Sequence, residues 1–169
     1  MALLQLPHTA GCIACGPANP HGLHLALFVD PAGAVHTRYT PRPEHIGFQG
    51  VLHGGVLATV VDEAMVWCAT WSGKRFCLCG ELSVRYRAPA VIGRPVTVVA
   101  RVLFARPRLL LTNAEVRDAA GALVAEAAGK YVPLTPQRNR EFVATILDDP
   151  EATTAVHELR QAAATSSPS

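Results

Sequence analysis

The chain has 169 residues, 50% of them hydrophobic, which suffices for one domain with a substantial core and is short for two. Its 15 lysines and arginines against 13 acidic residues give a formal net charge of +2, which excludes a strongly basic nucleic-acid binder. Five cysteines at irregular spacings indicate reduced thiols rather than a disulfide framework.

The N-terminal MALLQLP lacks the basic region and the apolar length of a signal peptide. Asp62 and Glu63 interrupt the one long apolar run, so we expect no membrane span and a cytoplasmic protein.

The first notable segment joins Cys12 and Cys15 to His21 and His24. These are residue types that bind zinc, but the five residues between the pairs are fewer than a zinc-finger module uses. We interpret the segment as a Gly- and Pro-rich turn with small thiols, and we expect no metal. A thioredoxin-like redox pair is disfavoured because the glycine and prolines after Cys15 break a helix.

Two short β-compatible runs follow, residues 24–29 and 34–40. The intervening Asp30-Pro31-Ala32-Gly33 has its Asp, Pro and Gly where a type I turn prefers them. The sequence therefore predicts a hairpin, which prolines end before a glycine-rich loop begins.

A helix that is apolar on nearly every side is predicted from Val56 to Trp71, so we expect it to lie in the middle of the protein. Asp62 and Glu63 lie within it, although an unpaired buried acid is costly. Adjacent residues on a helix point about 100° apart, so the two acids cannot serve one reacting atom equally well. At least one of them is a candidate functional group.

Beyond the helix the hydrophobic pattern has period two for more than fifty residues, which predicts long antiparallel strands near 82–87, 96–104, 109–117 and 123–132. With the first hairpin this makes about six strands. The economical way to bury the helix and the strands together is to curl the sheet around the helix, an α+β architecture.

The C-terminal segment has a weak helical period over 138–147, and Asp149-Pro150-Glu151 predicts the start of a helix that ends near Gln161. We expect residues 162–169 to be disordered. The interpretation is one domain over residues 1–135, followed by a helical segment and tail over 136–169 that form no separate domain.

Several motifs together resemble the hotdog-fold acyl-CoA thioesterases of the phenylacetate-pathway (PaaI) type. They are His53-Gly54-Gly55 before the apolar helix, Asp62 nine residues after the histidine, and Val84-Arg85-Tyr86-Arg87-Ala88-Pro89 in a strand. The Cys-x-x-Cys-Gly stretch from Cys12 to Leu23 is similar to a subgroup of that family. The resemblance covers roughly residues 12–133.

The resemblance implies a hotdog fold, subunits paired into a homodimer or a dimer of dimers, and hydrolysis of an acyl-CoA thioester. Coenzyme A is then part of the substrate, and no separate cofactor is expected. Asp62 matches the carboxylate that attacks or activates water, and Gly54 matches the backbone N–H donor to the thioester oxygen. Many relatives place Asn or Gln six residues before the histidine, where this chain has Gly47; His45 and Gln49 are the nearby polar substitutes.

The remaining candidates follow from general chemistry. His53 is either a structural hydrogen-bonding partner, the favoured reading, or a proton-transfer group. Gly55 permits close approach at the start of the helix, and Glu63 is expected to have a polar partner. Five basic residues are candidates for contacting the phosphates of coenzyme A, namely Arg85, Arg87, Arg106, Arg108 and Lys130.

Two other functions are open at this stage. A non-catalytic acyl-CoA-binding hotdog module would keep the glycine loop without needing Asp62. A hotdog dehydratase or hydratase would be expected to use a catalytic histidine with an acid at a different spacing.

Overall fold

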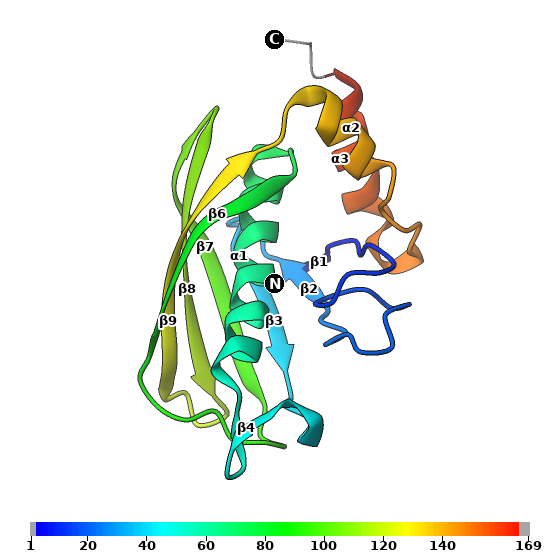
Figure 1. Ribbon diagram of the computed structural model, residues 1–169. Helices are drawn as coiled ribbons and strands as arrows, with labels where there is room; N and C mark the ends of the chain where they lie inside the picture. The colour runs from blue at the N-terminus through cyan, green and yellow to red at the C-terminus, as the bar shows by residue number, and fades with distance from the viewer. Residues whose placement is uncertain (1–2, 166–169) are drawn as a thin grey trace.

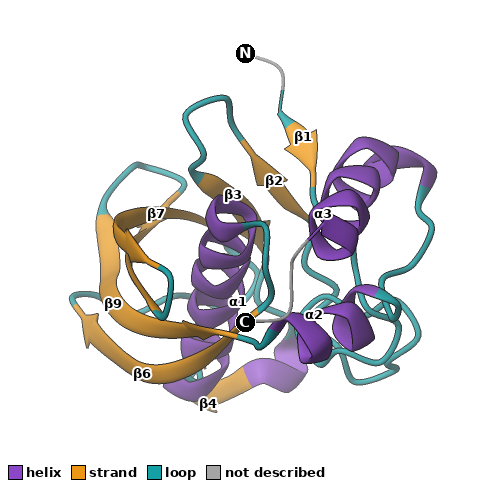
Figure 2. Ribbon diagram, turned by 90° about the horizontal axis from the view of Figure 1, so that it is seen from above, coloured by secondary structure: helices purple, strands orange, loops and turns teal. Residues whose placement is uncertain are grey.

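In the computed structural model, which describes residues 3–165, a seven-stranded antiparallel sheet curls around one long helix (Figures 1 and 2). This is the α+β hotdog arrangement that the sequence predicts. In spatial order the strands are β1 (Leu4–Gln5), β2 (Leu27–Val29), β3 (Val35–Tyr39), β7 (Val96–Arg106), β8 (Leu109–Asp118), β9 (Leu123–Pro133) and β6 (Cys77–Tyr86).

The strand count differs from the predicted six in two places. The two-residue β1 pairs with the outer edge of β2, and it is too short to show any period in the sequence. A separate hairpin of β4 (Ile46–Phe48) and β5 (Val51–Leu52) forms within the glycine-rich loop, where we expected no strand.

The predicted turns form as expected and set the register of the long strands. The Asp118 carboxylate accepts hydrogen bonds from the backbone N–H groups of Ala120 and Ala122, both at 2.9 Å, and Gly121 has a φ of 84°. Asp30 accepts the same pair of bonds in the first hairpin. Such Asp side chains replace the backbone partners that a tight turn leaves unpaired.

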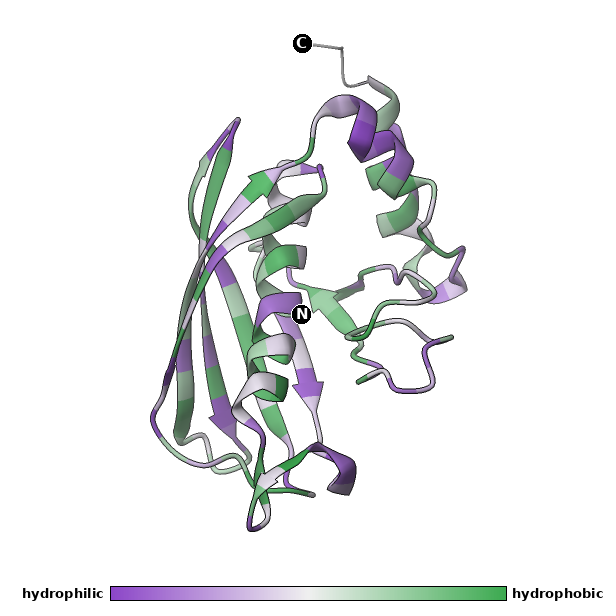
Figure 3. Cartoon of the chain, viewed as in Figure 1, coloured by the Kyte–Doolittle hydropathy of each residue, from purple (hydrophilic) through white to green (hydrophobic). Residues whose placement is uncertain are grey.

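The central helix α1 (Gly54–Gly73) extends the prediction by two residues at each end. His53 caps its N-terminus, and Lys74, with a φ of 48°, ends it in a left-handed conformation. One side of the helix packs against the sheet and is at most 2% exposed; its residues are Leu57, Val60, Val61, Ala64, Met65 and Cys68. Figure 3 shows the helix as mostly hydrophobic with a hydrophilic turn near its middle.

The side of α1 that faces away from the sheet is also covered. The N-terminal segment lies there together with α2 (Pro136–Val143) and α3 (Thr153–Thr165) (Figures 1 and 2). Two single 3-10 turns complete the elements: η1 (Pro43–His45) lies between β3 and β4, and η2 (Pro150–Ala152) lies between α2 and α3. The Asn139 side-chain oxygen, in α2, accepts a hydrogen bond from the Phe76 N–H at 2.8 Å. Lys74 pairs with Glu158 of α3 at 2.7 Å.

The expected disorder from residue 162 onward is wrong for residues 162–165, because α3 continues to Thr165 with Ala163 buried. Residues 166–169 lie outside the described part of the chain. Within that part, every helix is too short or too polar to cross a membrane.

Candidate active site

The N-terminus of α1 presents an unpaired backbone donor. The His53 carbonyl accepts hydrogen bonds from the N–H groups of Val56 and Leu57, and His53 Nδ1 accepts one from Gly55 at 3.0 Å. The Gly54 N–H has no hydrogen-bond partner among residues 3–165. His53 therefore acts as a helix cap here, in line with the structural reading, and Gly54 keeps a free donor at the positive end of the helix dipole.

Tyr86 lies directly against Gly54. Its hydroxyl donates a hydrogen bond to the Gly54 carbonyl at 2.7 Å, and a Cβ added to Gly54 would lie 3.4 Å from the Tyr86 ring carbon and hydroxyl. A methyl group at position 54 would therefore meet the ring at ordinary contact distance. Beside this contact is a cavity of about 390 Å³ with mostly apolar walls, formed by Val51, Leu52, Gly54, Leu57, Tyr86 and residues 87–90.

Asp62 lies on the half-exposed edge of α1 that faces β9 and β6. The Tyr131 hydroxyl donates a hydrogen bond to Asp62 Oδ1 at 2.7 Å, and Tyr131 itself is fully buried. Burial raises the pKa of Tyr131, so the hydroxyl stays protonated and remains a donor. A Cβ at Gly129 would lie 2.7 Å from the Tyr131 ring, so the glycine there makes room for the ring.

The exposed Cys79 completes the surroundings of Asp62. It is the cross-strand partner of Tyr131, and its thiol is near enough to Asp62 to feel the charge of that carboxylate. Burial of the sulfur, and then the Asp62 charge, raises the pKa of Cys79, which favours the neutral thiol. Sequence reasoning missed both residues; a tyrosine at an inward position of the last predicted strand was the only available signal.

Glu63 points away from this group, as the helical geometry predicts. Its Oε1 accepts a hydrogen bond from Trp67 Nε1 at 3.0 Å and lies 3.9 Å from the sulfur of Cys12. Burial raises the pKa of Glu63 to about 7. The expected polar partner of Glu63 is therefore present, and it is structural.

Asp62 and Gly54 do not converge within one chain. They lie eight residues apart on α1, which corresponds to about 12 Å along a helix axis. A reacting carbonyl in contact with the Gly54 N–H is therefore too far from the carboxylate of the same chain.

The structure places the two polar substitutes for Gly47, His45 and Gln49, in different surroundings. His45 is only 8% exposed; its Nδ1 is hydrogen-bonded to the Tyr39 hydroxyl, and its Nε2 lies 3.2 Å from Arg42. The Gln49 side chain is exposed at the tip of the β4–β5 hairpin, where positive φ angles at Gln49 and Gly50 form a type I′ turn.

Packing explains the departure at Gly47. A Cβ there would lie 2.8 Å from the Cα of His53, closer than real side chains come to a backbone atom. With this loop conformation, an Asn or Gln at position 47 has no room, so the chain has no polar side chain at that place.

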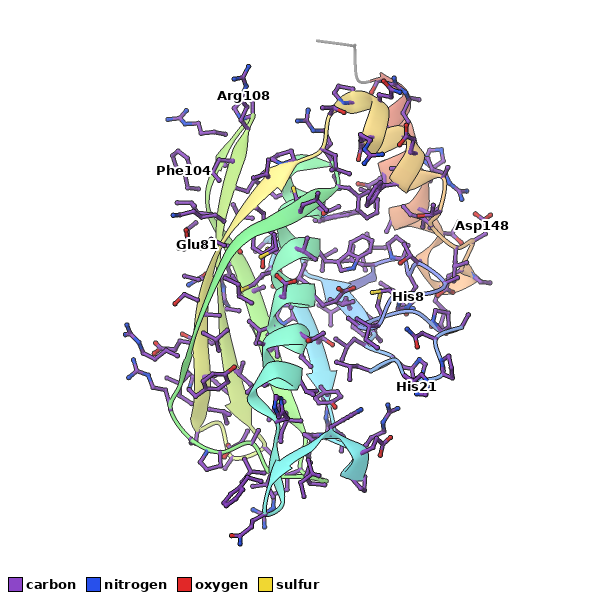
Figure 4. All side chains as sticks on the ribbon, viewed as in Figure 1. His8, His21, Glu81, Phe104, Arg108 and Asp148 are labelled. Atoms are coloured by element: carbon purple, nitrogen blue, oxygen red, sulfur yellow. The ribbon has the colours of Figure 1, made fainter. Side chains whose placement is uncertain are left out.

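The five candidate basic residues are not brought together. Tyr86 points toward α1, so its strand neighbours Arg85 and Arg87 lie on the opposite face of the sheet. Arg87 pairs with Glu126 at 2.6 Å, and Lys130 pairs with Glu81 at 2.6 Å. Arg106 and Arg108 belong to the β7–β8 hairpin, and Figure 4 shows Arg108 at the tip of that hairpin.

An antiparallel sheet wrapped around a helix defines a hotdog protein. The free N–H at the start of the helix and the hydrogen-bonded carboxylate on its exposed edge are groups that acyl-group chemistry uses. A profile of the thioesterase superfamily matches residues 49–125. Human acyl-coenzyme A thioesterase 13 is 31% identical over 105 residues, which are 60% of this chain and 74% of that protein. The chain belongs to the thioesterase superfamily.

Solved structures support the fold. The E. coli PaaI protein from the phenylacetic acid degradation operon superposes with a TM-score of 0.62 at 18% identity, covering 66% of this chain and 80% of that one. The smu.793 protein of Streptococcus mutans, bound to acetyl CoA, superposes with a TM-score of 0.61 at 15% identity, covering 65% and 88%.

A different kind of match involves part of the chain only. A segment of 71 residues is 42% identical to a 10-deoxymethynolide desosaminyltransferase of Streptomyces venezuelae, and the match spans 38% of this chain. The match covers only 16% of the transferase's length, so the transferase activity is not carried over to this chain.

Proposed function

We propose that this protein hydrolyses acyl-CoA thioesters to a free acid and coenzyme A. Water adds to the carbonyl carbon overall, the carbon–sulfur bond breaks, and the thiol of coenzyme A leaves. The Asp62 carboxylate acts as the nucleophile or as the base that activates water. Superfamily membership and the likeness to an acyl-coenzyme A thioesterase support the substrate class.

The observation that carries the proposal is the unpaired Gly54 N–H beside an apolar cavity. Negative charge develops on the thioester oxygen when the carbonyl is attacked, and a fixed N–H at a helix N-terminus stabilises that charge. The adjoining cavity of about 390 Å³ accepts the acyl chain, because its walls are mostly apolar.

The proposed active site is shared between two subunits. In the described chain, β6 pairs with β9 and leaves its other edge open. If β6 pairs antiparallel with β6 of a second subunit, and the pairing is centred on the middle of the strand, the Cys79 end of one strand lies beside the Tyr86 end of the other. Since Cys79 lies at Asp62 and Tyr86 lies on Gly54, each Asp62 then approaches the partner subunit's Gly54.

Exposed apolar side chains support the same assembly. Phe48 is 74% exposed and Ile46 51% exposed on the β4–β5 hairpin, and Tyr86 is 50% exposed on the open strand. Apolar side chains of this size, next to an unpaired strand edge, favour a covered surface. A homodimer is the smallest assembly that covers them, and a dimer of dimers extends it.

The nucleotide end of coenzyme A carries phosphates that arginine binds well. We assign this contact first to Arg85, which is exposed and has no ion pair within residues 3–165, whereas Arg87 is paired with Glu126. The cytoplasmic location remains a prediction from the sequence.

The test combines an acyl-CoA panel, with detection of the released thiol, and two variants of one position. Gly54→Pro deletes the proposed donor at a site that tolerates proline, because Gly54 is the first helical residue and His53 before it is extended, with a ψ of 131°. We expect turnover to fall by about 10² to 10³ with an unchanged melting temperature. Gly54→Ala keeps the N–H and should retain most activity.

Full activity of Gly54→Pro would refute the donor role. Absence of thiol release from every acyl-CoA in the panel, with tight binding retained, would favour the binding-module alternative. Hydration of an enoyl-CoA without thiol release would favour the hydratase.

A further inference from the structure

Three side chains of metal-binding type meet on the side of α1 away from the sheet. They are Cys12, Cys15 and Glu63, and one ligand atom from each lies within 4.8 Å of the others. Cys15 is buried, while Cys12 and Glu63 are half-buried. The N-terminal segment that carries the two cysteines lies on this side of the helix, where Figure 4 labels His8 and His21. None of the three belongs to the proposed catalytic groups.

Backbone hydrogen bonds within the loop hold the two cysteines in place. The Gly16 N–H donates to the Cys12 carbonyl at 2.9 Å, and the Ala14 N–H donates to the Cys12 sulfur at 3.3 Å. A Cβ at Gly16 would lie 2.4 Å from the Cys12 nitrogen, so this tight turn requires glycine. The Ala14 carbonyl accepts from Leu25 N–H at 2.9 Å, which ties the loop to the segment before β2.

Glu63 is oriented toward the sulfurs by a second residue. Trp67, one helical turn further along α1, donates its indole N–H to Glu63 Oε1 at 3.0 Å. The two carboxylate oxygens then lie 3.9 and 4.0 Å from the Cys12 sulfur. A hydrogen bond from a neighbouring group to a ligand is the usual way in which proteins orient the ligands of a metal.

The cluster contains electron-pair donors without a positive charge. Among the described ion pairs, none involves Glu63, and no histidine joins this group of ligand atoms. Removing an ionised carboxylate from water without a compensating cation is costly. Tetrahedral zinc bound by sulfur and oxygen separates those atoms by about 3.5 Å. The Cys12 sulfur and the Glu63 oxygens, at 3.9 and 4.0 Å, are close to that separation, and the Cys15 sulfur, within 4.8 Å of the others, would move inward to join them.

We propose that Cys12, Cys15 and Glu63 bind one divalent cation of the zinc type. Thiolates select such cations over magnesium or calcium, and water completes the four ligands through the exposed side of the cluster. The site fastens the N-terminal segment to α1 on the turn that also carries Asp62. It is independent of the proposed catalytic activity.

This inference reverses the expectation of no metal, for a reason that the sequence did not contain. The sequence suggested His21 and His24 as the partners of the two cysteines. In the fold His21 is exposed, and His24 Nδ1 contacts the Gly16 carbonyl at 3.2 Å, so neither histidine joins the group. The third ligand instead comes from a residue 48 positions after Cys15.

The experiment uses the full chain without a purification tag, reduced and prepared without chelator. Elemental analysis should find about one zinc per chain. Removal of the metal and titration with Co²⁺ should produce thiolate-to-cobalt absorption, and adding zinc back should raise the melting temperature. Glu63→Gln keeps the shape of the side chain and should weaken metal binding at least tenfold, as should Cys12→Ser. His21→Gln is the matched control and should bind like the parent.

Three outcomes would overturn the proposal. One is the absence of zinc in the parent together with no Co²⁺ absorption on titration. A second is metal binding that survives Glu63→Gln but is lost in His21→Gln. The third is a chain isolated without reductant that is free of metal and exposes only three thiols after denaturation, because two of the five cysteines would then be joined in a disulfide.

Discussion

The two adjacent acids of α1 show how much a residue's role depends on its neighbours in space. Asp62 lies at the half-exposed edge, held by Tyr131, and Glu63 faces Trp67 and the cysteine loop. The sequence predicted that they point in different directions, because the helical period alone determines that. It did not predict Tyr131 or Cys79, because these contacts depend on how two strands far along the chain align with the helix.

Replacing Asp62 by Asn tests the proposed catalytic carboxylate. The amide keeps an oxygen that accepts from Tyr131, so we expect the fold and acyl-CoA binding to persist. Turnover should fall by about 10² to 10⁴, the range for loss of a general base. Thiol release and a thermal melt measure the two effects separately.

Asp148→Asn is the matched control for that change. This acid lies in the C-terminal segment, where it pairs with Arg160 at 2.6 Å, and Figure 4 shows it on the side of α1 opposite the long strands. The Asp148→Asn variant should hydrolyse substrate at the parent rate. Equal rates in the two variants would remove Asp62 from the mechanism.

At the scale of elements, the prediction succeeded where periodicity is long and failed where close contacts decide. The buried sector of α1 and the four long strands were predictable because each repeats its pattern over many residues. The short hairpin β4–β5 was not, because its two-residue turn depends on positive φ angles at Gln49 and Gly50. The surroundings of His45 were not predictable for a related reason: the loop folds back and buries the ring between Tyr39 and Arg42.

The buried ring makes the stability of the η1–β4–β5 region sensitive to pH. Burial, and then the charge of Arg42, lowers the pKa of His45 below its ordinary value of about 6.5. The unfolded chain therefore takes up a proton that the folded chain resists. The contribution of the neutral His45 ring to the free energy of unfolding is fully present above about pH 6.5, and it is lost as the pH falls below that value.

Denaturant melts between about pH 7 and pH 5, compared for the parent and His45→Gln, measure this effect. The raised pKa of Glu63 acts in the opposite direction, since its contribution grows as the pH falls, so the difference between the two proteins isolates the histidine. We expect the parent to lose more stability than the variant on acidification. Identical pH dependence would show that His45 does not titrate differently in the folded state.

For the whole molecule, the sequence predicted a sheet curled around a helix but not what covers the outer face of that helix. That cover depends on single side chains, such as Asn139 bonding to Phe76 and Lys74 pairing with Glu158, which leave no periodic pattern. With α1 enclosed on both sides, the open edge of β6 and the exposed apolar side chains near it are the surface left for pairing. The proposed assembly uses that surface.

Mixing two inactive variants tests whether the site is shared. Gly54→Pro lacks the donor and Asp62→Asn lacks the carboxylate, so each homodimer should be nearly inactive. In a mixed dimer, the intact Gly54 of one subunit meets the intact Asp62 of the other, so one of the two sites is complete. Random pairing makes about half of the dimers mixed, and the co-expressed chains should recover about one quarter of the parent's activity.

The measurement needs proof that mixed dimers form, which two tags of different mass on the two chains provide by native mass spectrometry. If mixed dimers are present but the sample is as inactive as each variant alone, the donor and the carboxylate belong to one chain. Gly54 and Asp62 are about 12 Å apart along α1, which is about two helical turns. A movement within the chain would then have to bring the two groups together. Light scattering of the parent at micromolar concentration supplies the independent check, because a stable monomer has no second subunit with which to share a site.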